Sequence, residues 1–424
     1  MTKYFEEREA APRAQREIGL LARLPDALRR ACQHAPAIAR QLQGVDPDAI
    51  RGRGDLTQIP VIRKSQLLQM QLDMRMGRAG QDLHVVSRIF GGFSAIGWGE
   101  ALRVFASPGP MYEPESGRSD YWRFARALYA AGFRSKQLVH NCFSYHFTPA
   151  GSMMETAAHA LGCTVFPGGI GQTEQQVHAM ADLAPAGYTG TPSFLKIILE
   201  KADELGIALP SLRRALFSGE AFPPSLQHWF AERGIDGYQA YGSADLGMVA
   251  YETSAREGLV VNEDLILEIV QPGGNTPLAD GEVGEIVVTT LNPDYPLVRF
   301  GTGDLSAVMP GVSPCGRSNI RIKGWMGRAD QTTKVRGMFV HPEQVAEVVR
   351  RHPEIRKARL LVSGAVGTDY MTLRVETTDA SPGLMARVTE SVREVTKLRA
   401  TLEPMPVGAL PNDGKVIDDL RSYE

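Results

Sequence analysis

The beginning of the chain shows the spacing of an amphipathic helix. Between residues 5 and 45, leucine, alanine and isoleucine side chains recur at three- and four-residue steps, with charged residues between them. Such steps bring the apolar side chains onto one face of a helix. We therefore predict that this opening segment is helical.

From about residue 120 to residue 241, helical patterns alternate with short apolar runs. The expected helices cover residues 120–131, 151–161, 174–183 and 193–205 and a stretch after residue 224, and the expected strands cover residues 138–142, 163–166, 186–189, 215–217 and 238–241. Thr191 and Pro192 supply an N-cap and a first-turn proline for one of these helices, and Gly206 supplies its end. The alternation predicts an α/β fold with a mainly parallel, doubly wound sheet.

Glycine-bearing segments follow several of the predicted strands. They are residues 168–171, 218–220 and 241–245. In doubly wound sheets, ligands bind beyond the carboxyl ends of the strands. We therefore expect these segments to face a substrate.

Past Gly247 the pattern changes to β-strands joined by turns. We expect these strands at residues 265–270, 285–290 and 297–300. They predict a β-rich subdomain beside the α/β core.

Around Gly327 a different pattern begins, with helices and strands mixed over a tail of about a hundred residues. A small α+β domain has this composition of elements. The sequence therefore predicts a large N-terminal domain, residues 1–327, and a small C-terminal domain, residues 328–424.

Composition narrows the range of partners. A chain of 424 residues is too long for a single compact core, and its net charge of −2 gives no basic surface for nucleic acid. No apolar run approaches the ~18 residues of a membrane span, and the first residues are too charged for a signal peptide. The four cysteines form no CxxC pair, which argues against a disulfide framework or a zinc site. We expect a cytoplasmic protein whose partners are small molecules, with no nucleic acid and no membrane.

Candidate chemistry lies in short motifs of the second half. In RFGTGDLS, a tight turn at the end of a strand would present Asp304, whose carboxylate can accept both vicinal hydroxyls of a ribose. In GWMGRADQTTKVRG, Arg328 and Asp330 fall at the predicted domain boundary. In LPNDGK, Lys415 follows a glycine and could bring a positive charge to a phosphate. Taken alone, the first two motifs are better explained as plain or charged surface turns, and Lys415 as a solvated surface lysine.

Together, in this order and behind YGSADLG, these motifs resemble the adenylate-forming enzymes, and among those the phenylacetate-CoA ligases. The likeness runs from about residue 5 to the end and includes residues 55–67, 166–177, 190–195 and 262–305. It implies an AMP-forming carboxylate-CoA ligase with the adenylate-forming fold and a mobile C-terminal domain. The implied reactants are ATP, CoA and a carboxylic acid, with Mg²⁺ as cofactor.

The resemblance implies a nucleotide site in the large domain. Tyr241 would stack on adenine, Asp304 would hold the ribose hydroxyls, and Asp245 stands where the family usually has a magnesium-binding glutamate. The implied nucleotide-binding residues are Ser218, Gly219, Glu220, Tyr241, Gly242, Ser243, Asp304 and Arg328.

The resemblance also implies a domain rotation between two half-reactions. Lys415 would reach the α-phosphate and carboxylate oxygens during adenylation, where negative charge develops. Asp330 would be the hinge of the small domain. Lys334, Arg336 and Gly337 lie on the segment that the family uses for the CoA half-reaction.

The phosphate-binding loop of the family, rich in serine, threonine and glycine, is missing in recognisable form. Residues 89–97 or residues 106–110 could replace it, because glycines expose backbone N–H groups that can cradle phosphate without side chains. We favour the second stretch, with Ser107 and Gly109 as phosphate-binding residues.

The acyl pocket is expected at Phe143, Tyr145, His146, Phe147, Gly168 and Gly169. The aromatic side chains favour a small aryl or short branched acid. His146 could pair with a polar group of the acid or could be structural.

Other functions stay open at this point. One is an adenylating ligase that passes its acyl group to an amine or a carrier protein. Another is a nucleotide- or acyl-CoA-binding protein that has lost catalysis, which the altered phosphate loop would suit. The presence of Asp304, Arg328 and Lys415 together argues against the second. Dimers are common among relatives of this kind, so a homodimer is also open.

Overall fold

The computed structural model describes residues 3–77, 88–329, 331, 333–365, 368–411 and 416–421. It divides the chain into the compact units Met1–Met326 and Gly327–Glu424. The division lies at Gly327, where the sequence pattern changes.

The opening segment of the first unit is helical, as predicted. Its elements are η1 (Glu7–Glu9), α1 (Arg13–Ala22), α2 (Leu24–His34), α3 (Pro36–Gln41), η2 (Pro47–Ala49), η3 (Asp55–Gln58) and α4 (Lys64–Arg75). The helix breaks between α2 and α3 because Pro36 disfavours the helical conformation of Ala35, which is extended at φ −120°. Leu24, Leu28 and Ile38 are buried in the core that this segment shares with a neighbouring β-sheet.

A mixed sheet forms the centre of this unit, with the strand order β14-β15-β10-β9-β8-β7-β6-β4-β5. The strands are β4 (Leu138–Asn141), β5 (Thr164–Phe166), β6 (Gly187–Gly190), β7 (Arg214–Phe217), β8 (Asp236–Ser243), β9 (Gly247–Glu252), β10 (Leu259–Val261), β14 (Val308–Met309) and β15 (Arg321–Ile322). From β8 to β5 the neighbouring strands are parallel, and from β8 to β14 they are antiparallel. The predicted parallel sheet is therefore confirmed.

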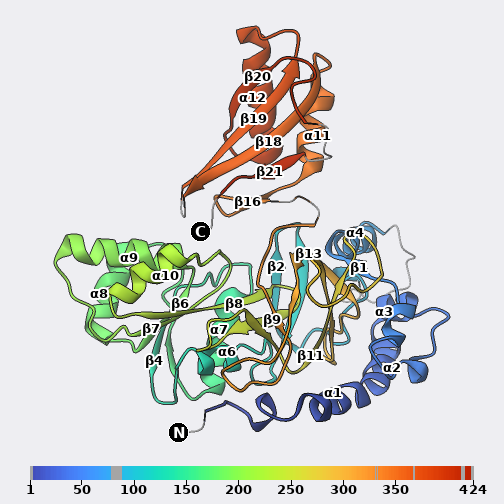
Figure 1. Ribbon diagram of the computed structural model, residues 1–424, viewed down its shortest axis with the longest axis vertical. Helices are drawn as coiled ribbons and strands as arrows, with labels where there is room; N and C mark the ends of the chain where they lie inside the picture. The colour runs from blue at the N-terminus through green and yellow to red at the C-terminus, as the bar shows by residue number, and fades with distance from the viewer. Residues whose placement is uncertain are drawn as a thin grey trace. The chain divides into compact units, whose positions relative to one another are not determined.

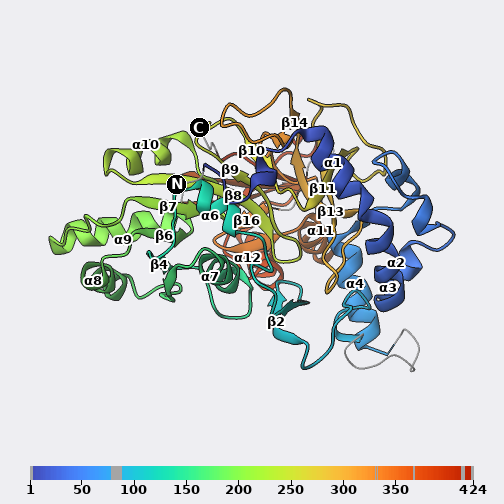
Figure 2. The ribbon, with the colours of Figure 1, turned by 90° about the horizontal axis from the view of Figure 1, so that it is seen from below.

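Helices cover both faces of the parallel part (Figures 1 and 2). They are α6 (Ala125–Ala130), α7 (Ala150–Ala160), α8 (Thr173–Leu183), α9 (Pro192–Leu205) and α10 (Pro224–Glu232). Leu216 on β7 packs in the cluster of α6 and α7, whereas its neighbours Ala215 and Phe217 pack in the cluster of α8, α9 and α10. Alternate side chains of a strand point to opposite faces, so both faces of β7 are apolar.

Local signals set the ends of these helices. Thr191 Oγ1 accepts a hydrogen bond from Phe194 N at 3.4 Å, and Gly206 ends α9 at φ +68°. The helix predicted from residue 120 begins only at Ala125, because the backbone at Asp120 has a φ of +48° and its carboxylate accepts from Ala125 N at 3.1 Å.

A second sheet, of strand order β1-β13-β12-β11, packs against the opening helices. Its strands are β1 (Ile62–Arg63), β11 (Leu265–Val270), β12 (Gly284–Thr290) and β13 (Phe300–Ser306), and β2 (Ala101–Ser107) forms a separate hairpin with β3 (Met111–Ser116). The strand predicted at residues 297–300 was misplaced. The strand begins at Phe300, so most of the RFGTGDLS motif lies within it.

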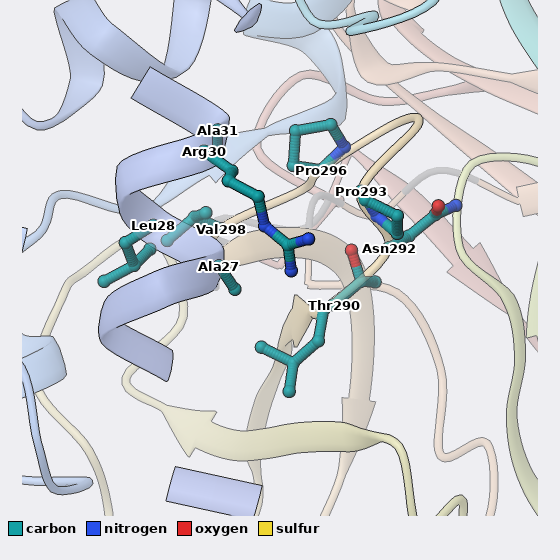
Figure 3. A pocket seen from close by; sticks show the side chains of 10 residues that line it. Ala27, Leu28, Arg30, Ala31, Thr290, Asn292, Pro293, Pro296 and Val298 are labelled. Carbon is teal, nitrogen blue, oxygen red and sulfur yellow. The ribbon is translucent and has the colours of Figure 1, made fainter. Parts of the chain in front are cut away.

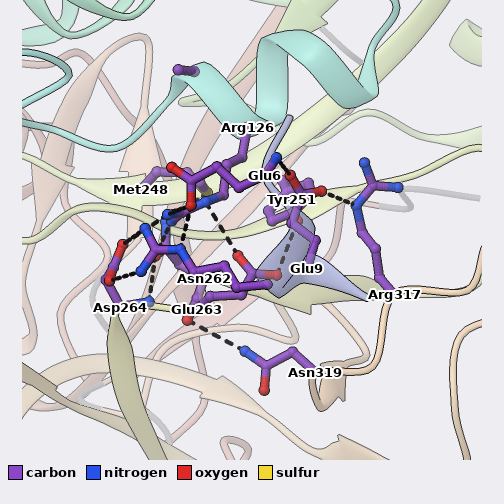
Figure 4. Close-up of polar contacts among 12 residues, drawn as sticks. Glu6, Glu9, Arg126, Met248, Tyr251, Asn262, Glu263, Asp264, Arg317 and Asn319 are labelled. Carbon is purple, nitrogen blue, oxygen red and sulfur yellow. Dashed lines mark hydrogen bonds and ion pairs between the residues drawn. The ribbon is translucent and has the colours of Figure 1, made fainter. Parts of the chain in front are cut away.

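Polar side chains hold the N-terminal residues 6–9 against the rest of this unit (Figure 4). Arg126 on α6 is buried and donates to Glu6 Oε2 and Asp264 Oδ2, both at 2.9 Å, and its Nε lies 3.6 Å from Glu263 Oε2. Arg8 binds the same Asp264 through both terminal nitrogens. Burial opposes the charge of Asp264, but the two arginines outweigh it and lower its pKa to about 2.

The second unit is an α+β domain. Its elements are β16 (Thr333–Val335), β17 (Met338–Val340), α11 (Pro342–Arg351), β18 (Ile355–Ala365), β19 (Thr368–Thr377), α12 (Pro382–Thr396), β20 (Thr401–Met405) and β21 (Ile417–Asp419). Val348 of α11 and Val388 of α12 pack in one core with Leu360 and Leu373 of the sheet β20-β19-β18-β21. Among the described residues of the whole chain, no helix is both long and apolar enough to cross a membrane.

Candidate active site

The segments that follow the parallel strands lie on the same side of the central sheet, at the carboxyl ends of those strands. Residues 143–147 follow β4 and residues 168–169 follow β5, and these two strands are hydrogen-bonded neighbours. Residues 218–220 follow β7, and residues 241–243 end the adjacent strand β8. The candidate acyl residues therefore lie together, and so do the candidate adenine residues.

Asp304 reaches this side of the sheet through a β-bulge. In the β12–β13 ladder, Glu285 pairs with Leu305 and Val287 pairs with Gly301, so residues 302–304 lie opposite a single residue. Gly303 has a φ of +74°, which a residue with a side chain rarely adopts. The expected tight turn at the end of a strand is therefore wrong, because a bulge inside the strand presents Asp304.

The carboxylate of Asp304 is held by aromatic side chains from other segments. Tyr241 Oη donates to its Oδ2 at 2.7 Å, and Trp325 Nε1 donates to its Oδ1 at 3.1 Å. A carboxylate has two oxygens, so it can accept hydrogen bonds from both vicinal hydroxyls of a ribose. The structure thus brings Asp304 and Tyr241 together, as a ribose next to an adenine requires. Sequence reasoning did not single out Trp325, although it lies inside the quoted motif.

The segment after β7 is open. Gly219 has a φ of +79°, and a Cβ atom there would meet nothing within 4 Å. Glu220 is exposed, and its Oε2 accepts from Ser193 Oγ at 2.5 Å at the beginning of α9. In contrast, Gly242 is closely packed, because a Cβ there would lie 2.5 Å from the carbonyl oxygen of Gly247.

Asp245 lies in the turn between β8 and β9, and its side chain is fully buried. Lys64, the first residue of α4, donates to its Oδ2 at 2.8 Å. Its other oxygen, Oδ1, has no hydrogen-bond partner among the described residues. No local pattern pairs these two residues, because Lys64 precedes Asp245 by a long stretch of chain.

A second buried carboxylate, Glu113 on β3, joins Asp245 to the candidate phosphate turn. Ser107 Oγ donates to Glu113 Oε1 at 2.6 Å. Burial, together with the nearby charge of Asp245, raises the pKa of Glu113 to about 8. Glu113 Oε2 has no partner among the described residues. No sequence motif marks this residue.

The two stretches considered for the phosphate loop differ in packing. In the first, Phe90 and Phe93 are buried in the core, and the carbonyl of Gly92 accepts from Ala37 N at 2.9 Å. In the second, Ser107 ends β2 and residues 108–110 form an exposed turn to β3. An exposed turn is open to a phosphate, so the packing favours the second stretch.

The aromatic residues after β4 are not all alike. Phe143 packs in the core beside α6 and α7, and Tyr145 Oη accepts from Asn141 Nδ2 at 2.8 Å. His146 is exposed, and Phe147 is 80% exposed with a φ of +61°. Phe143 and Tyr145 therefore contact neighbouring parts of the protein, whereas His146 and Phe147 are exposed.

The glycines after β5 have different surroundings. A Cβ on Gly168 would lie 2.5 Å from Gln176 Oε1 and 2.9 Å from His140 Nε2. A Cβ on Gly169 would meet nothing within 4 Å, and Gly169 N donates to the carbonyl of Asn141 at 3.0 Å. Gly168 therefore packs against the protein, while Gly169 faces open space.

Known proteins are similar to this chain in sequence. The AMP-binding enzyme family matches residues 121–292. The chain is 31% identical to the phenylacetate-coenzyme A ligase of Thermus thermophilus, over 89% of this chain and 84% of the relative. It is 30% identical to the Escherichia coli phenylacetate-coenzyme A ligase, over 85% of this chain and 82% of the relative. The chain belongs to the phenylacetate-CoA ligase family. It is an AMP-forming acyl-CoA synthetase.

A solved structure supports the fold. The crystal structure of 2-hydroxyisobutyryl-CoA ligase, in complex with 2-HIB-AMP and CoA in the thioesterification state, superimposes with a TM-score of 0.80. The alignment covers 100% of this chain and 93% of that chain, at 22% sequence identity. The adenylate-forming fold expected from the sequence is thus confirmed.

The remaining candidates of this ligase lie in its second unit. Arg328 is partly exposed, while Asp330 and Lys415 lie outside the described residues. Lys334 is exposed on β16, and Arg336 and Gly337 form the turn to β17 with φ values of +48° and +83°. Two positive φ values are typical of the tightest hairpin turn, so this segment is a hairpin.

Two hollows in the large unit contain none of the predicted acyl residues. A cleft between α2 and residues 290–298 holds about 10 Å³, which is space for about one water molecule (Figure 3). A more open hollow of about 230 Å³ lies beside Arg118 and His159. The smaller cleft is too small for an acyl group.

The contacts of Asp304 predict nucleotide selectivity. The carboxylate of Asp304, which Tyr241 holds, would accept hydrogen bonds from the two ribose hydroxyls of ATP. Asp304→Ala should therefore raise the KM for ATP about a hundredfold, because both of these bonds to a charged group are lost. It should also abolish the preference for ATP over 2′-deoxy-ATP and 3′-deoxy-ATP. Asp280→Ala, at an exposed aspartate in the turn before β12, is the control and should retain that preference. Equal discrimination by Asp304→Ala and the unmodified enzyme would remove Asp304 from the ribose site.

Proposed function

We propose that this ligase activates a small aryl or short branched carboxylic acid with ATP and transfers the acyl group to CoA. The hydrogen bond from Tyr241 to Asp304 carries the proposal. It joins the carboxylate that would bind ribose to the carboxyl ends of the parallel strands, where the candidate acyl residues also lie. Curated relatives are named for phenylacetate and the structural neighbour for 2-hydroxyisobutyrate, which are an aryl and a short branched acid.

In the first half-reaction, a carboxylate oxygen of the acid attacks the α-phosphorus of ATP. A new O–P bond forms, the bond to the bridging oxygen breaks, and pyrophosphate leaves. Tyr241 and Asp304 would hold the adenosine, with Ser218, Gly219 and Glu220 at its rim. Lys415 would stabilise the negative charge that develops at the α-phosphate.

In the second half-reaction, the thiolate of CoA attacks the carbonyl carbon of the acyl-adenylate. A C–S bond forms, and the C–O bond to AMP breaks. The first step takes place at the α-phosphorus and the second at the carbonyl carbon, but both use one pocket and need different groups there, so the small domain would turn about Asp330 between them. Lys334, Arg336 and Gly337 would then serve the CoA step.

The residues around Asp245 suit a magnesium ion. Asp245 Oδ1 and Glu113 Oε2 are buried carboxylate oxygens with no partner among the described residues. Mg²⁺ prefers one or two carboxylates combined with substrate phosphates. Asp245 would hold the ion, with Glu113 nearby, and the ion would offset the charge of the ATP phosphates.

The proposed function is tested with a panel of acids, including phenylacetate, benzoate and 2-hydroxyisobutyrate, each with ATP, Mg²⁺ and CoA. We expect pyrophosphate release without CoA and a stoichiometric acyl-CoA product with CoA, identified by mass spectrometry. Adenylate formation with acyl transfer only to an amine or a carrier protein would contradict transfer to CoA. Absence of ATP consumption with every acid would contradict the activity on these acids.

The turn at residues 108–110 gives a further prediction. Gly109→Ala places a methyl group about 3.1 Å from Leu68 Cδ1 and should shift the exposed backbone. If the N–H group of Gly109, which lies between two prolines, binds the β- or γ-phosphate, the KM for ATP should rise about tenfold, since one N–H bond to a charged group is lost, while affinity for AMP stays unchanged. Gly117→Ala, where a Cβ meets nothing within 4 Å, is the control. An equal loss of ATP and AMP affinity would mean that the turn does not bind these phosphates.

A further inference from the structure

A buried glutamine holds the segment that follows β5. Gln176 lies on α8, 3% exposed, and its Nε2 is placed to donate to the carbonyls of Gly168 at 2.9 Å and of Gly169 and Gly171, both at 3.2 Å. A side-chain amide carries only two hydrogens, so these bonds are shared. One side chain therefore contacts three carbonyl groups of the segment that follows β5.

The other end of the same amide is held by a histidine. His140 Nε2 lies 2.6 Å from Gln176 Oε1. Because the NH₂ group of Gln176 faces carbonyls, its Oε1 must face the histidine, so His140 Nε2 carries the hydrogen. Burial lowers the pKa of His140, which keeps the ring neutral in this role. Phe166 stacks on the same ring, with centroids 4.9 Å apart.

The strand that carries His140 also anchors the neighbouring acyl segment. Asn141 Nδ2 donates to Tyr145 Oη at 2.8 Å and to the carbonyl of Gly151 at 2.9 Å. Asn141 Oδ1 accepts from Phe143 N at 3.2 Å. The end of β4 thus fixes the segments after β4 and after β5 through two adjacent side chains.

We propose that Gln176, oriented by His140, is the positioning residue that shapes the acyl-binding segment at residues 166–171 and thereby sets how narrowly the enzyme selects its acid. The proposal rests on the proposed function. Gln176 and His140 leave no room for a side chain at Gly168. The space beside Gly169 is open, so that residue can face the acid. A segment held through its carbonyls cannot readily yield to a larger or differently shaped acid, so its fixed conformation favours one shape of acyl group.

Gln176→Leu tests the proposal, because leucine has a similar size and donates no hydrogen bond. We expect the KM for the best acid to rise about tenfold and the preference for that acid over the others to fall about tenfold, with the KM for ATP unchanged. Gln175→Leu is the matched control, since Gln175 is the preceding residue of α8 and is exposed. It should behave like the unmodified enzyme.

Gly168→Ala perturbs the same contact from the other side and should give the same loss of acid preference. Hydrogen exchange of the backbone amides should become faster in residues 166–172 of Gln176→Leu. Unchanged exchange in α9 would show that the fold of the variant is intact. Unchanged acid preference in Gln176→Leu, or an equal rise in the KM for ATP and for the acid, would overturn the proposal. If the unmodified enzyme activates no acid at all, the proposed function fails, and this proposal fails with it.

Discussion

Replacing Lys415 with alanine should slow adenylate formation by at least about a thousandfold, because a positive charge at the developing phosphate charge contributes several kcal/mol to the transition state. The residue follows Asp413 and Gly414 near the end of the small domain, in the motif LPNDGK. The measurement is ATP–pyrophosphate exchange in the presence of the preferred acid.

The same variant should still convert a pre-made acyl-adenylate and CoA to acyl-CoA at nearly the original rate, since the charge on the α-phosphate is then already formed. Lys201→Ala is the control, because Lys201 lies on the surface of α9 beside Glu204. Adenylation by Lys415→Ala at the original rate would take this lysine out of the mechanism. Equal loss in both half-reactions would indicate a structural role.

Replacing Arg126 with methionine should lower the free energy of unfolding of the first unit by about 3–5 kcal/mol, because it leaves the buried Glu263 without its nearest counter-charge and Asp264 with one arginine fewer. Arg126 binds Glu6 and Asp264 and lies beside Glu263 (Figure 4). Tryptophan fluorescence during urea unfolding is the measurement, since all four tryptophans lie before residue 327.

Arg118→Met is the control for this change, because Arg118 is 54% exposed and its stability effect should be small. A cost below about 1 kcal/mol for Arg126→Met would show that the cluster does not stabilise the fold.

The same cluster predicts how stability depends on pH. The pKa of Asp264 is lowered to about 2 in the folded chain, so its contribution is present above the ordinary value of 3.8 and is lost as pH falls toward 2. The shift corresponds to about 2 kcal/mol. The stability advantage of the unmodified chain over Asp264→Asn should therefore shrink between pH 5 and pH 2. A constant difference over this range would contradict the lowered pKa.

Much of the fold could be predicted from local patterns. The alternation of helices and apolar strands between residues 120 and 241 gave the parallel sheet, because burial on both faces requires strands that are apolar throughout. Thr191 and Gly206 gave the ends of α9, since capping and positive φ depend on neighbouring residues alone. The order of the motifs gave the family.

The local patterns failed where tertiary contacts decide the conformation. Asp304 was expected in a turn, but the pairing of β12 with β13 forces a bulge at residues 302–304. The helix expected from residue 120 starts later for a local reason, because the Asp120 carboxylate accepts a hydrogen bond from Ala125 N and the backbone at Asp120 has a positive φ.

The polar partners of the site depend on the tertiary structure as well. Trp325 on Asp304, Lys64 on Asp245 and His140 on Gln176 join residues that no local period relates. Periodicity reports which face of an element is buried, but which polar groups meet depends on how separate elements pack. The sequence by itself therefore determined the fold class, the family and the residue types that the chemistry needs. The tertiary structure alone decided which of those residues touch, because their contacts join distant parts of the chain.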